Sequence, residues 1–246
     1  MTRRKSRPPG RQQHPDFGLD APYIVAANAL LALAGAALIN LGAATSPGAQ
    51  WSGIACLIGG SATAGLMTYS SRVGKVRARD RLLGRLQFTG NEHVLDLGCG
   101  SGLMLLAAAQ RLTTGHATGV DRWRTRDQAG STAARCHDNA RILGVNDRIT
   151  LIEADMTDLP FPPASFDVVL ASLALHNLHP SSRRQQAMRE AIRVLRPGGR
   201  ILIIDIAGTK LYTRTARNSG LADVQRSGFV AGIWPPARSV TGYIAP

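Results

Sequence analysis

One stretch of the chain decides its fold: Val94-Leu95-Asp96-Leu97-Gly98-Cys99-Gly100-Ser101-Gly102. Its apolar first half is typical of a short buried strand, and the alternating glycines that follow predict a tight turn that opens a helix. Glycine is needed where the backbone turns sharply and where a ligand must approach without meeting a Cβ atom. We therefore expect a strand, a ligand-binding turn and a helix in succession here.

An acidic residue, Asp96, stands two positions before the first glycine, and the glycines follow the spacing G-x-G-x-G. A dinucleotide site has the spacing G-x-G-x-x-G and binds a pyrophosphate at a helix N-terminus, beside which a carboxylate is unfavourable. A carboxylate favours a cationic ligand instead, such as S-adenosylmethionine with its sulfonium and ammonium groups. A nicotinamide dehydrogenase is therefore the least favoured class of enzyme.

Apolar strands and helical segments alternate through the rest of this region. We expect strands at residues 93–97, 117–120, 148–152, 166–172 and 200–206. We expect helices between them at residues 103–111, 128–143, 181–195 and 211–219. Two late strands, at 224–233 and 239–244, have no helix between them and predict an antiparallel edge. The pattern predicts an α/β fold, a Rossmann-like three-layer sandwich with a mostly parallel seven-stranded sheet.

The glycine stretch and four later motifs resemble, in the same order, those of the class I S-adenosylmethionine-dependent methyltransferases. The later motifs are Gly119-Val120-Asp121, Glu153-Ala154-Asp155-Met156, Phe166-Asp167-Val168-Val169-Leu170 and Arg193-Val194-Leu195-Arg196-Pro197-Gly198-Gly199-Arg200. The resemblance covers about residues 89–246. It implies S-adenosyl-L-methionine as the cofactor.

The resemblance also implies roles for individual residues: Asp121 would bind both ribose hydroxyls, and Asp155 with Met156 would face the adenine. Chain topology supports Asp121 separately, because the carboxyl ends of neighbouring parallel strands converge beside the glycine turn. Trp123 either covers the adenine or packs as an ordinary aromatic residue, and Asp155 is alternatively a loop acid. The expected cofactor-binding residues are Asp96, Gly98, Cys99, Gly100, Gly102, Asp121, Arg122, Trp123, Asp155, Met156 and Ser172.

The methyl acceptor should lie after the fourth strand, at residues 173–179. Methyltransferases of planar amides carry an Asn/Asp-Pro-Pro-aromatic signature there, which this chain lacks. The segment is similar instead to the small-molecule branch, typified by ubiquinone and menaquinone methyltransferases. His176 is the candidate for contact with the acceptor or for general base, the alternative being a structural histidine. No third ligand accompanies His176 and His179, so we expect no metal site.

The N-terminal part carries no Asp, Glu, Lys, Arg or His between Ala21 and Ser71. Segments 22–44 and 51–70 each have the roughly 20 residues that a membrane-spanning helix needs. The Pro- and Gly-containing stretch between them predicts a turn. We expect a transmembrane hairpin at residues 21–71; the alternatives are a buried helical pair of a soluble protein and a signal peptide.

The formal net charge of +13 is concentrated on both flanks of this hairpin. Basic residues favour the cytoplasmic side of a membrane, so we expect both termini and residues 89–246 there. Residues 1–20 read as a basic disordered tail, and residues 72–88 as an amphipathic connecting helix. The location of the charge disfavours specific nucleic-acid binding. Three cysteines without paired spacing fit a reducing compartment.

The leading hypothesis is a membrane-anchored methyltransferase that acts on a small apolar or lipid-like acceptor at the cytoplasmic face. One alternative is a protein methyltransferase recruited to a membrane partner. Another is a membrane-anchored protein that binds S-adenosylmethionine without turnover. The sequence specifies neither the acceptor nor the oligomeric state.

Overall fold

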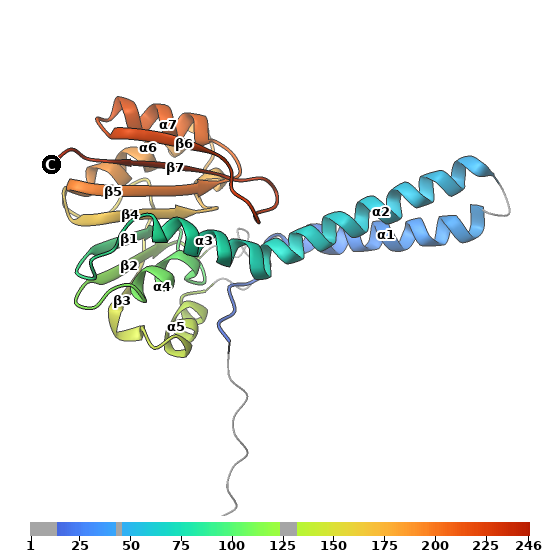
Figure 1. The fold of residues 1–246 in the computed structure, drawn as a ribbon, viewed down its shortest axis with the longest axis horizontal. Coiled ribbons are helices and arrows are strands. Elements are labelled where there is room, and N and C mark those ends of the chain that lie inside the picture. Colours follow the sequence, from blue (N-terminus) through green and yellow to red (C-terminus); the bar gives the residue numbers. More distant parts are fainter. Residues whose placement is uncertain (1–13, 43–45, 124–131) are drawn as a thin grey trace, which may run out of the picture.

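The glycine stretch forms the centre of a seven-stranded sheet in the computed structural model, which describes residues 14–42, 46–123 and 132–246. The strand order is β3-β2-β1-β4-β5-β7-β6 (Figure 1). The strands are β1 (His93–Leu97), β2 (His116–Asp121), β3 (Ile149–Glu153), β4 (Phe166–Ser172), β5 (Leu195–Asp205), β6 (Ala222–Phe229) and β7 (Arg238–Tyr243). The first five strands are mutually parallel, so β1, β2 and β4 end at the same edge.

Helices cover both faces of this sheet, as the alternation of elements predicts. They are α3 (Lys75–Gly84), α4 (Leu103–Ala109), α5 (Ala133–Ile142), α6 (Ser181–Arg193) and α7 (Thr209–Asn218). Val94 packs in one core with α3, α4 and α5, whereas Leu95 and Leu97 pack in the other with α6 and α7. This division follows from the two-residue period of a strand. The predicted Rossmann-like, three-layer fold is confirmed.

The antiparallel strand lies one place further inside than expected. β7 pairs antiparallel with β5 on one side and with β6 on the other. The edge strand is therefore β6, which runs in the same direction as β5. The chain reaches this order because the loop after β6 brings β7 back between β6 and the parallel strands.

Two long helices, α1 (Pro22–Gly42) and α2 (Pro47–Tyr69), pack side by side and extend away from the sheet (Figure 1). Ser46 caps α2 by accepting a hydrogen bond from Ala49 N, so the expected turn at 45–50 is already helical from Pro47. Glycines let the two backbones approach: a Cβ on Gly35 would lie 2.6 Å from Gly53 O. Small residues of this kind allow close helix packing in lipid.

Enlarging Gly35 is expected to disrupt this packing. The Gly35→Leu variant has no space against α2, and overpacking of this kind costs about 1–3 kcal/mol. Thermal unfolding in detergent, followed by helical circular dichroism, should therefore begin at a lower temperature. Gly59→Leu is the matched control, because a Cβ on Gly59 meets no atom within 4 Å. Equal shifts for both variants would contradict this role of Gly35.

The surface of the two long helices is largely apolar and exposed, with Leu30 66% and Ile58 63% exposed. α1 is the one helix of the described chain that is long and apolar enough to cross a membrane. α2 has sufficient length, but its Gly, Ser and Thr residues lower its apolarity. Of the two expected spans, α1 thus meets the criterion and α2 does not.

Residues 14–20, which we expected within a disordered tail, lie against the α/β domain that the sheet and its covering helices form. The Phe17 side chain is buried, with the Arg79 guanidinium 5.6 Å from its ring centre. Asp16 exchanges hydrogen bonds with the buried side chain of Asn139, which also donates to Ser101 O at 3.0 Å. An aromatic anchor and specific polar partners thus order a segment whose composition alone favours disorder; residues 1–13 lie outside the described chain.

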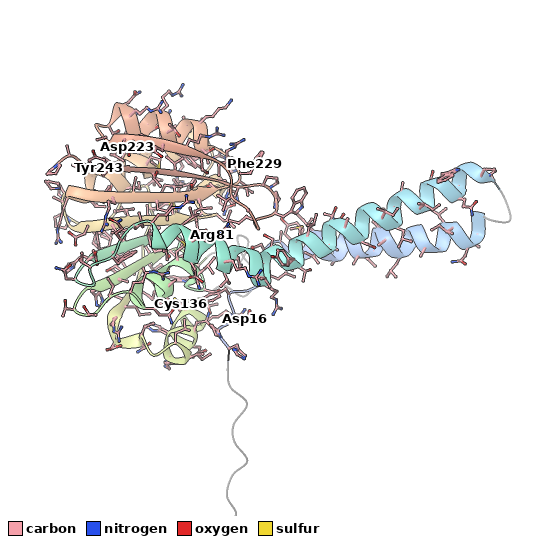
Figure 2. The ribbon with its side chains drawn as sticks, in the orientation of Figure 1. Asp16, Arg81, Cys136, Asp223, Phe229 and Tyr243 are labelled. Atoms are coloured by element: carbon pink, nitrogen blue, oxygen red, sulfur yellow. The ribbon has the colours of Figure 1, made fainter. Side chains whose placement is uncertain are left out.

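The connection to the α/β domain is helical throughout, because α2 passes through a π-helical turn (Ser70–Gly74) directly into α3. At this turn a Cβ on Gly74 would overlap the carbonyl of Gly232, so only glycine permits the contact. In α3 the apolar residues Ala78, Leu82 and Leu83 are buried. The side chains in Figure 2 show Phe229 at the end of the domain that faces the two long helices and Tyr243 at the opposite end.

Candidate cofactor and acceptor site

A cavity of about 350 Å³ lies at the carboxyl ends of β1, β2 and β4. Open α/β sheets bind their ligands at this position. Of the expected site residues, the following line it: Asp96, Gly98, Cys99, Gly100, Asp121, Trp123, Met156, Ser172 and His176. Gly102, Arg122 and Asp155 do not.

The glycine turn presents bare backbone to the cavity. Gly98 and Gly100 have φ angles of +70° and +52°, in the left-handed region that favours glycine. A Cβ on Gly98 would stand 2.5 Å from Ala174 Cβ and fill the space beside Met156. Gly102 has a different role, since it begins α4 and a Cβ there would meet Cys136 Sγ at 2.8 Å.

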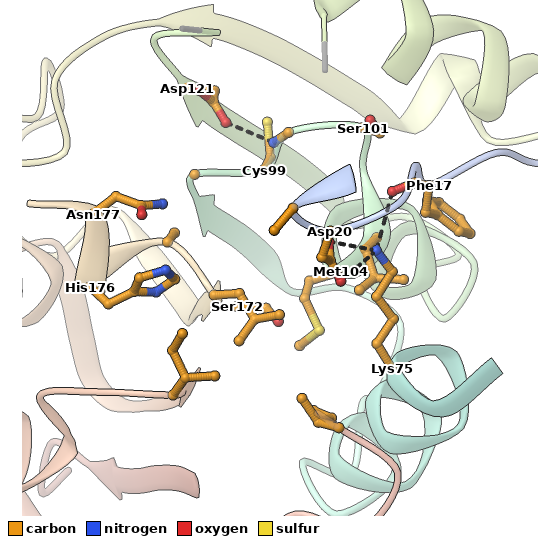
Figure 3. Close-up of a pocket in the computed structure, with 18 of the residues that line it drawn as sticks. Phe17, Asp20, Lys75, Cys99, Ser101, Met104, Asp121, Ser172, His176 and Asn177 are labelled. Carbon is orange, nitrogen blue, oxygen red and sulfur yellow. Dashed lines mark hydrogen bonds and ion pairs between the residues drawn. The ribbon is translucent and has the colours of Figure 1, made fainter. Parts of the chain in front are cut away.

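Asp121 points toward the glycine turn, as the topology of β1 and β2 predicts. Its Oδ2 accepts a hydrogen bond from Gly100 N at 2.8 Å (Figure 3). Its Oδ1 accepts one from Trp123 N at 2.7 Å. These bonds fix the carboxylate at the rim of the cavity with further lone pairs available. Two adjacent hydroxyl groups suit such a carboxylate, because each of its oxygens accepts a bond.

Asp96 is buried beneath the same turn. Its Oδ2 accepts a hydrogen bond from Leu105 N at 2.9 Å, but its Oδ1 has no partner among the described residues. Burial, with a smaller contribution from the charge of Asp121, raises the pKa of Asp96 to about 8, although the hydrogen bond from Leu105 N acts in the opposite direction. A buried carboxyl with one unsatisfied oxygen fits a cationic ligand, which would stabilise its ionised form.

Arg122 and Asp155 were both expected to bind the cofactor. Their side chains instead form an ion pair with each other and do not line the cavity. Arg122 Nη1 lies 2.9 Å and Arg183 Nη2 2.6 Å from Asp155 Oδ2. Burial alone would raise the pKa of Asp155, but hydrogen bonds from Thr157 and the two arginine charges lower it overall. Trp123 does face the cavity, and its Nε1 donates to Gly100 O at 3.3 Å.

His176 lies on the acceptor side, in a short 3₁₀ helix (Leu175–Asn177) after β4. Its Nδ1 is 2.6 Å from Asp205 Oδ1, and its backbone N donates to Asp205 Oδ2 at 3.0 Å. Asp205 is 1% exposed and also accepts a hydrogen bond from the Tyr212 hydroxyl. Burial and the neighbouring Asp205 raise the pKa of Tyr212, so this hydroxyl stays protonated and acts as a donor.

Asp205 was not predicted from the sequence. It ends β5 after the buried run Ile201, Leu202, Ile203 and Ile204. The rule that located Asp121, an acid at the carboxyl end of a central parallel strand, applies equally to Asp205. That signal was available at the sequence level.

The two cysteines of the α/β domain, Cys99 and Cys136, are free thiols inside the protein. Burial raises the pKa of Cys136 to about 12, with smaller contributions from Asp96 and Asp121. Burial likewise raises the pKa of Cys99 well above its usual value. Both are therefore protonated and serve as small apolar side chains beside the turn.

A parallel sheet, its glycine turn, a rim carboxylate and a buried carboxyl enclose one cavity here, and this arrangement fits S-adenosyl-L-methionine as the cofactor. Residues 95–203 match the protein family described as "Methyltransferase domain". The match covers β1 to β5 and therefore the whole cofactor side of the cavity.

Several named methyltransferases are similar to this chain over part of their length. The chain is 38% identical over 132 residues to 27-O-demethylrifamycin SV methyltransferase of Amycolatopsis mediterranei (strain S699), covering 52% of this chain and 44% of that protein. It is 36% identical over 115 residues to the chloroplastic 2-phytyl-1,4-beta-naphthoquinone methyltransferase of Arabidopsis thaliana, covering 46% and 41%. The chain thus spans less than half the length of these relatives.

Among solved structures, the fold is similar to magnesium protoporphyrin IX methyltransferase (ChlM) from Synechocystis PCC 6803 with bound S-adenosylmethionine. The TM-score is 0.58 at 15% identity, over 73% of this chain and 84% of that one. At this identity the likeness concerns the fold alone.

Cofactor binding is expected to depend on pH through Asp96. The ligand-free protein holds this carboxyl protonated below about pH 8, whereas a bound cation favours its ionised form. The complex then binds fewer protons, so affinity rises with pH, by at most about tenfold per unit, and levels off above that pKa. Calorimetry from about pH 6 to about pH 9 measures this. Asp96→Asn should remove the dependence; an unchanged slope in that variant would refute the assignment.

Proposed function

We propose that the chain is a membrane-anchored methyltransferase that transfers the methyl group of S-adenosylmethionine to a small apolar or lipid-like acceptor at the cytoplasmic face. One observation carries this proposal. A single cavity is lined at once by the glycine turn, by Asp121, by His176 and by the first turn of the apolar helix α1.

The chain's own residues have distinct tasks in this reaction. Asp121 would hold the ribose hydroxyls, and Asp96 the cationic part of the cofactor, with the bare backbone at Gly98 and Gly100 allowing close approach. The cofactor supplies a methyl group already activated by its sulfonium. The residues that line the cavity would place the acceptor in line with that methyl group and exclude water, and positioning of this kind supplies most of the acceleration.

His176 would receive the proton that the acceptor loses. Because Asp205 accepts the hydrogen bond of Nδ1–H, the other ring nitrogen, Nε2, keeps its lone pair for the acceptor. The buried carboxylate also stabilises the imidazolium that forms. Asp205 is a positioning residue in this scheme, whereas His176 touches the reacting group.

The apolar hairpin supports a membrane location. Trp51 and Tyr69 stand at opposite ends of α2, separated by about 27 Å along the helix, close to the roughly 30 Å of a hydrocarbon core. Both side chains are exposed, 71% and 47%. Arg72, Arg77 and Arg81 follow the hairpin, and positive charge at this place favours a cytoplasmic catalytic domain.

The relatives support an apolar acceptor. One is named for a phytyl-naphthoquinone, which carries a long hydrocarbon chain, and another for a demethylrifamycin. A comparable acceptor would dissolve in the bilayer beside this cavity.

The test is a transfer assay with methyl-labelled S-adenosylmethionine. The purified protein in detergent is added to membranes of the producing cells, which are then separated into lipid and protein fractions. Label in the lipid fraction is expected, and Asp121→Ala should give none. Label confined to protein would favour the protein-methyltransferase alternative, and cofactor binding without any transfer would favour a non-catalytic protein. Absence of cofactor binding at millimolar concentration would reject the proposal.

A further inference from the structure

The cavity has a second wall, built by segments outside the matched methyltransferase region. We call it the hairpin wall: Tyr23, Ile24, Met67, Trp234 and Pro235. The first two residues begin α1, Met67 belongs to the last turns of α2, and the last two belong to the loop between β6 and β7. The reacting side of the cavity and the base of the apolar helices thus share one space.

The hairpin wall is held in place by specific contacts. Trp234 N donates a hydrogen bond to Ser70 Oγ at 2.8 Å, and Arg81 Nη2 donates to Ala231 O at 2.7 Å. The β6–β7 loop also packs backbone against backbone where Gly232 meets Gly74. The loop is therefore attached to the helical connection, and the cavity reaches the base of the hairpin as a built feature of the fold.

Exposed aromatic side chains lie at this end of the cavity: Tyr23 and Trp234 line it, and Tyr69 ends α2. Tyr23, Tyr69 and Trp234 are 70%, 47% and 39% exposed. Tyr and Trp concentrate at the boundary between lipid headgroups and hydrocarbon, because each combines an apolar ring with a polar group. Their position at the base of the hairpin indicates that the cavity mouth lies at headgroup depth.

The two ends of the cavity differ in polarity. Asp96, His176 and Asn177 line the end near the cofactor turn, whereas apolar and aromatic side chains make the hairpin wall. On the side across from His176, Lys75 Nζ lies 3.0 Å from Asp20 Oδ1 and 3.3 Å from Phe17 O (Figure 3). This buried ammonium is already paired with a carboxylate, so it offers no free positive charge to an anionic head.

We propose that the cavity opens sideways to the bilayer at the hairpin wall and admits the polar head of an uncharged amphiphile whose apolar tail remains in the membrane. This inference rests on the proposed function and names its substrate class: a membrane lipid whose head carries a hydroxyl or similar proton-bearing acceptor beside His176. The polar gradient of the cavity orients the molecule, and the aromatic residues set the depth of its mouth.

The depth of the mouth can be measured without any acceptor. One variant, Trp51→Phe with Trp123→Phe, keeps Trp234 alone; the control, Trp51→Phe with Trp234→Phe, keeps Trp123 alone. Both are reconstituted into phosphatidylcholine vesicles brominated near the top of the acyl chain. A mouth at the interface should quench Trp234 fluorescence about twofold and leave Trp123 nearly unchanged. Quenching of Trp234 no stronger than that of Trp123 would overturn the proposal.

A second, matched pair tests the route by activity. Trp234→Ala removes a residue of the hairpin wall, and Phe229→Ala removes an exposed aromatic residue at the same end of the domain that does not line the cavity. Transfer to cell lipids embedded in vesicles should fall about tenfold for the first variant alone, with the cofactor affinity of both unchanged. Equal activities would contradict the route. Failure of the parent protein to bind the cofactor would refute the proposed function. The quenching experiment would still measure the depth of the cavity mouth in the bilayer, because it needs neither cofactor nor acceptor.

Discussion

Replacement of Asp121 by alanine is expected to weaken the binding of S-adenosylmethionine by at least about 100-fold. Two charge-assisted hydrogen bonds to ribose hydroxyls disappear, at about 1.5 kcal/mol or more each, and about 1.4 kcal/mol corresponds to one factor of ten. The variant also loses the bonds that Asp121 accepts from Gly100 N and Trp123 N, which hold the glycine turn. Calorimetric titration of the purified variant measures the effect.

Glu153→Ala is the matched control. Glu153 ends β3 directly beside Asp121 in the parallel register, but it is exposed and does not line the cavity. The Glu153→Ala variant loses the same charge from the same edge of the sheet, so its affinity for the cofactor should stay within about twofold of that of the parent protein. A comparable loss in both variants would mean that net charge, and not the geometry of Asp121, governs binding.

The second large effect is expected at His176. His176→Asn should lower kcat by about 10²–10⁴-fold, the usual contribution of a general base, with the affinity for S-adenosylmethionine unchanged. Asp205→Asn should lower kcat in the same way, because an amide no longer holds the ring in the tautomer that leaves Nε2 free. The split between a reduced kcat and an intact cofactor affinity separates this role from simple unfolding.

The two residues act as one unit, so their effects should not add. The double variant is expected to lose no more activity than His176→Asn alone, as for other catalytic groups that depend on each other. His179→Asn is the control, since that histidine is exposed, lies three residues away and does not line the cavity. Full additivity of the two substitutions would show that Asp205 acts separately from His176.

The sequence was sufficient for the part of the site that local pattern and topology determine. β1 and β4 have the expected bounds, and Asp121 faces the glycine turn because parallel neighbours end at one edge. Such relations depend on strand order and on the two-residue period, both of which are visible in the chain. The fold and the position of Asp121 beside the glycine turn were predictable for this reason.

Partners far apart in the sequence were not predictable. Arg183 lies 28 residues after Asp155 yet binds its carboxylate, and together with Arg122 this keeps Asp155 out of the cavity. Phe17 and Asp20 contact α3 more than fifty residues later. The composition of a segment indicates how well water solvates it, but not the surface against which it folds. The contribution of Phe17 and Asp20 to the cavity is therefore seen only in the structure.

The unbroken helical path from residue 47 to residue 84 has a mechanical consequence. It runs from the far tip of the hairpin to α3, which packs on α4, and α4 begins at the glycine turn. In the proposed membrane-anchored arrangement, a tilt of the hairpin in a thinner or thicker bilayer would therefore rotate the α/β domain with it. The height of the reacting atoms above the lipid would then follow the thickness of the membrane.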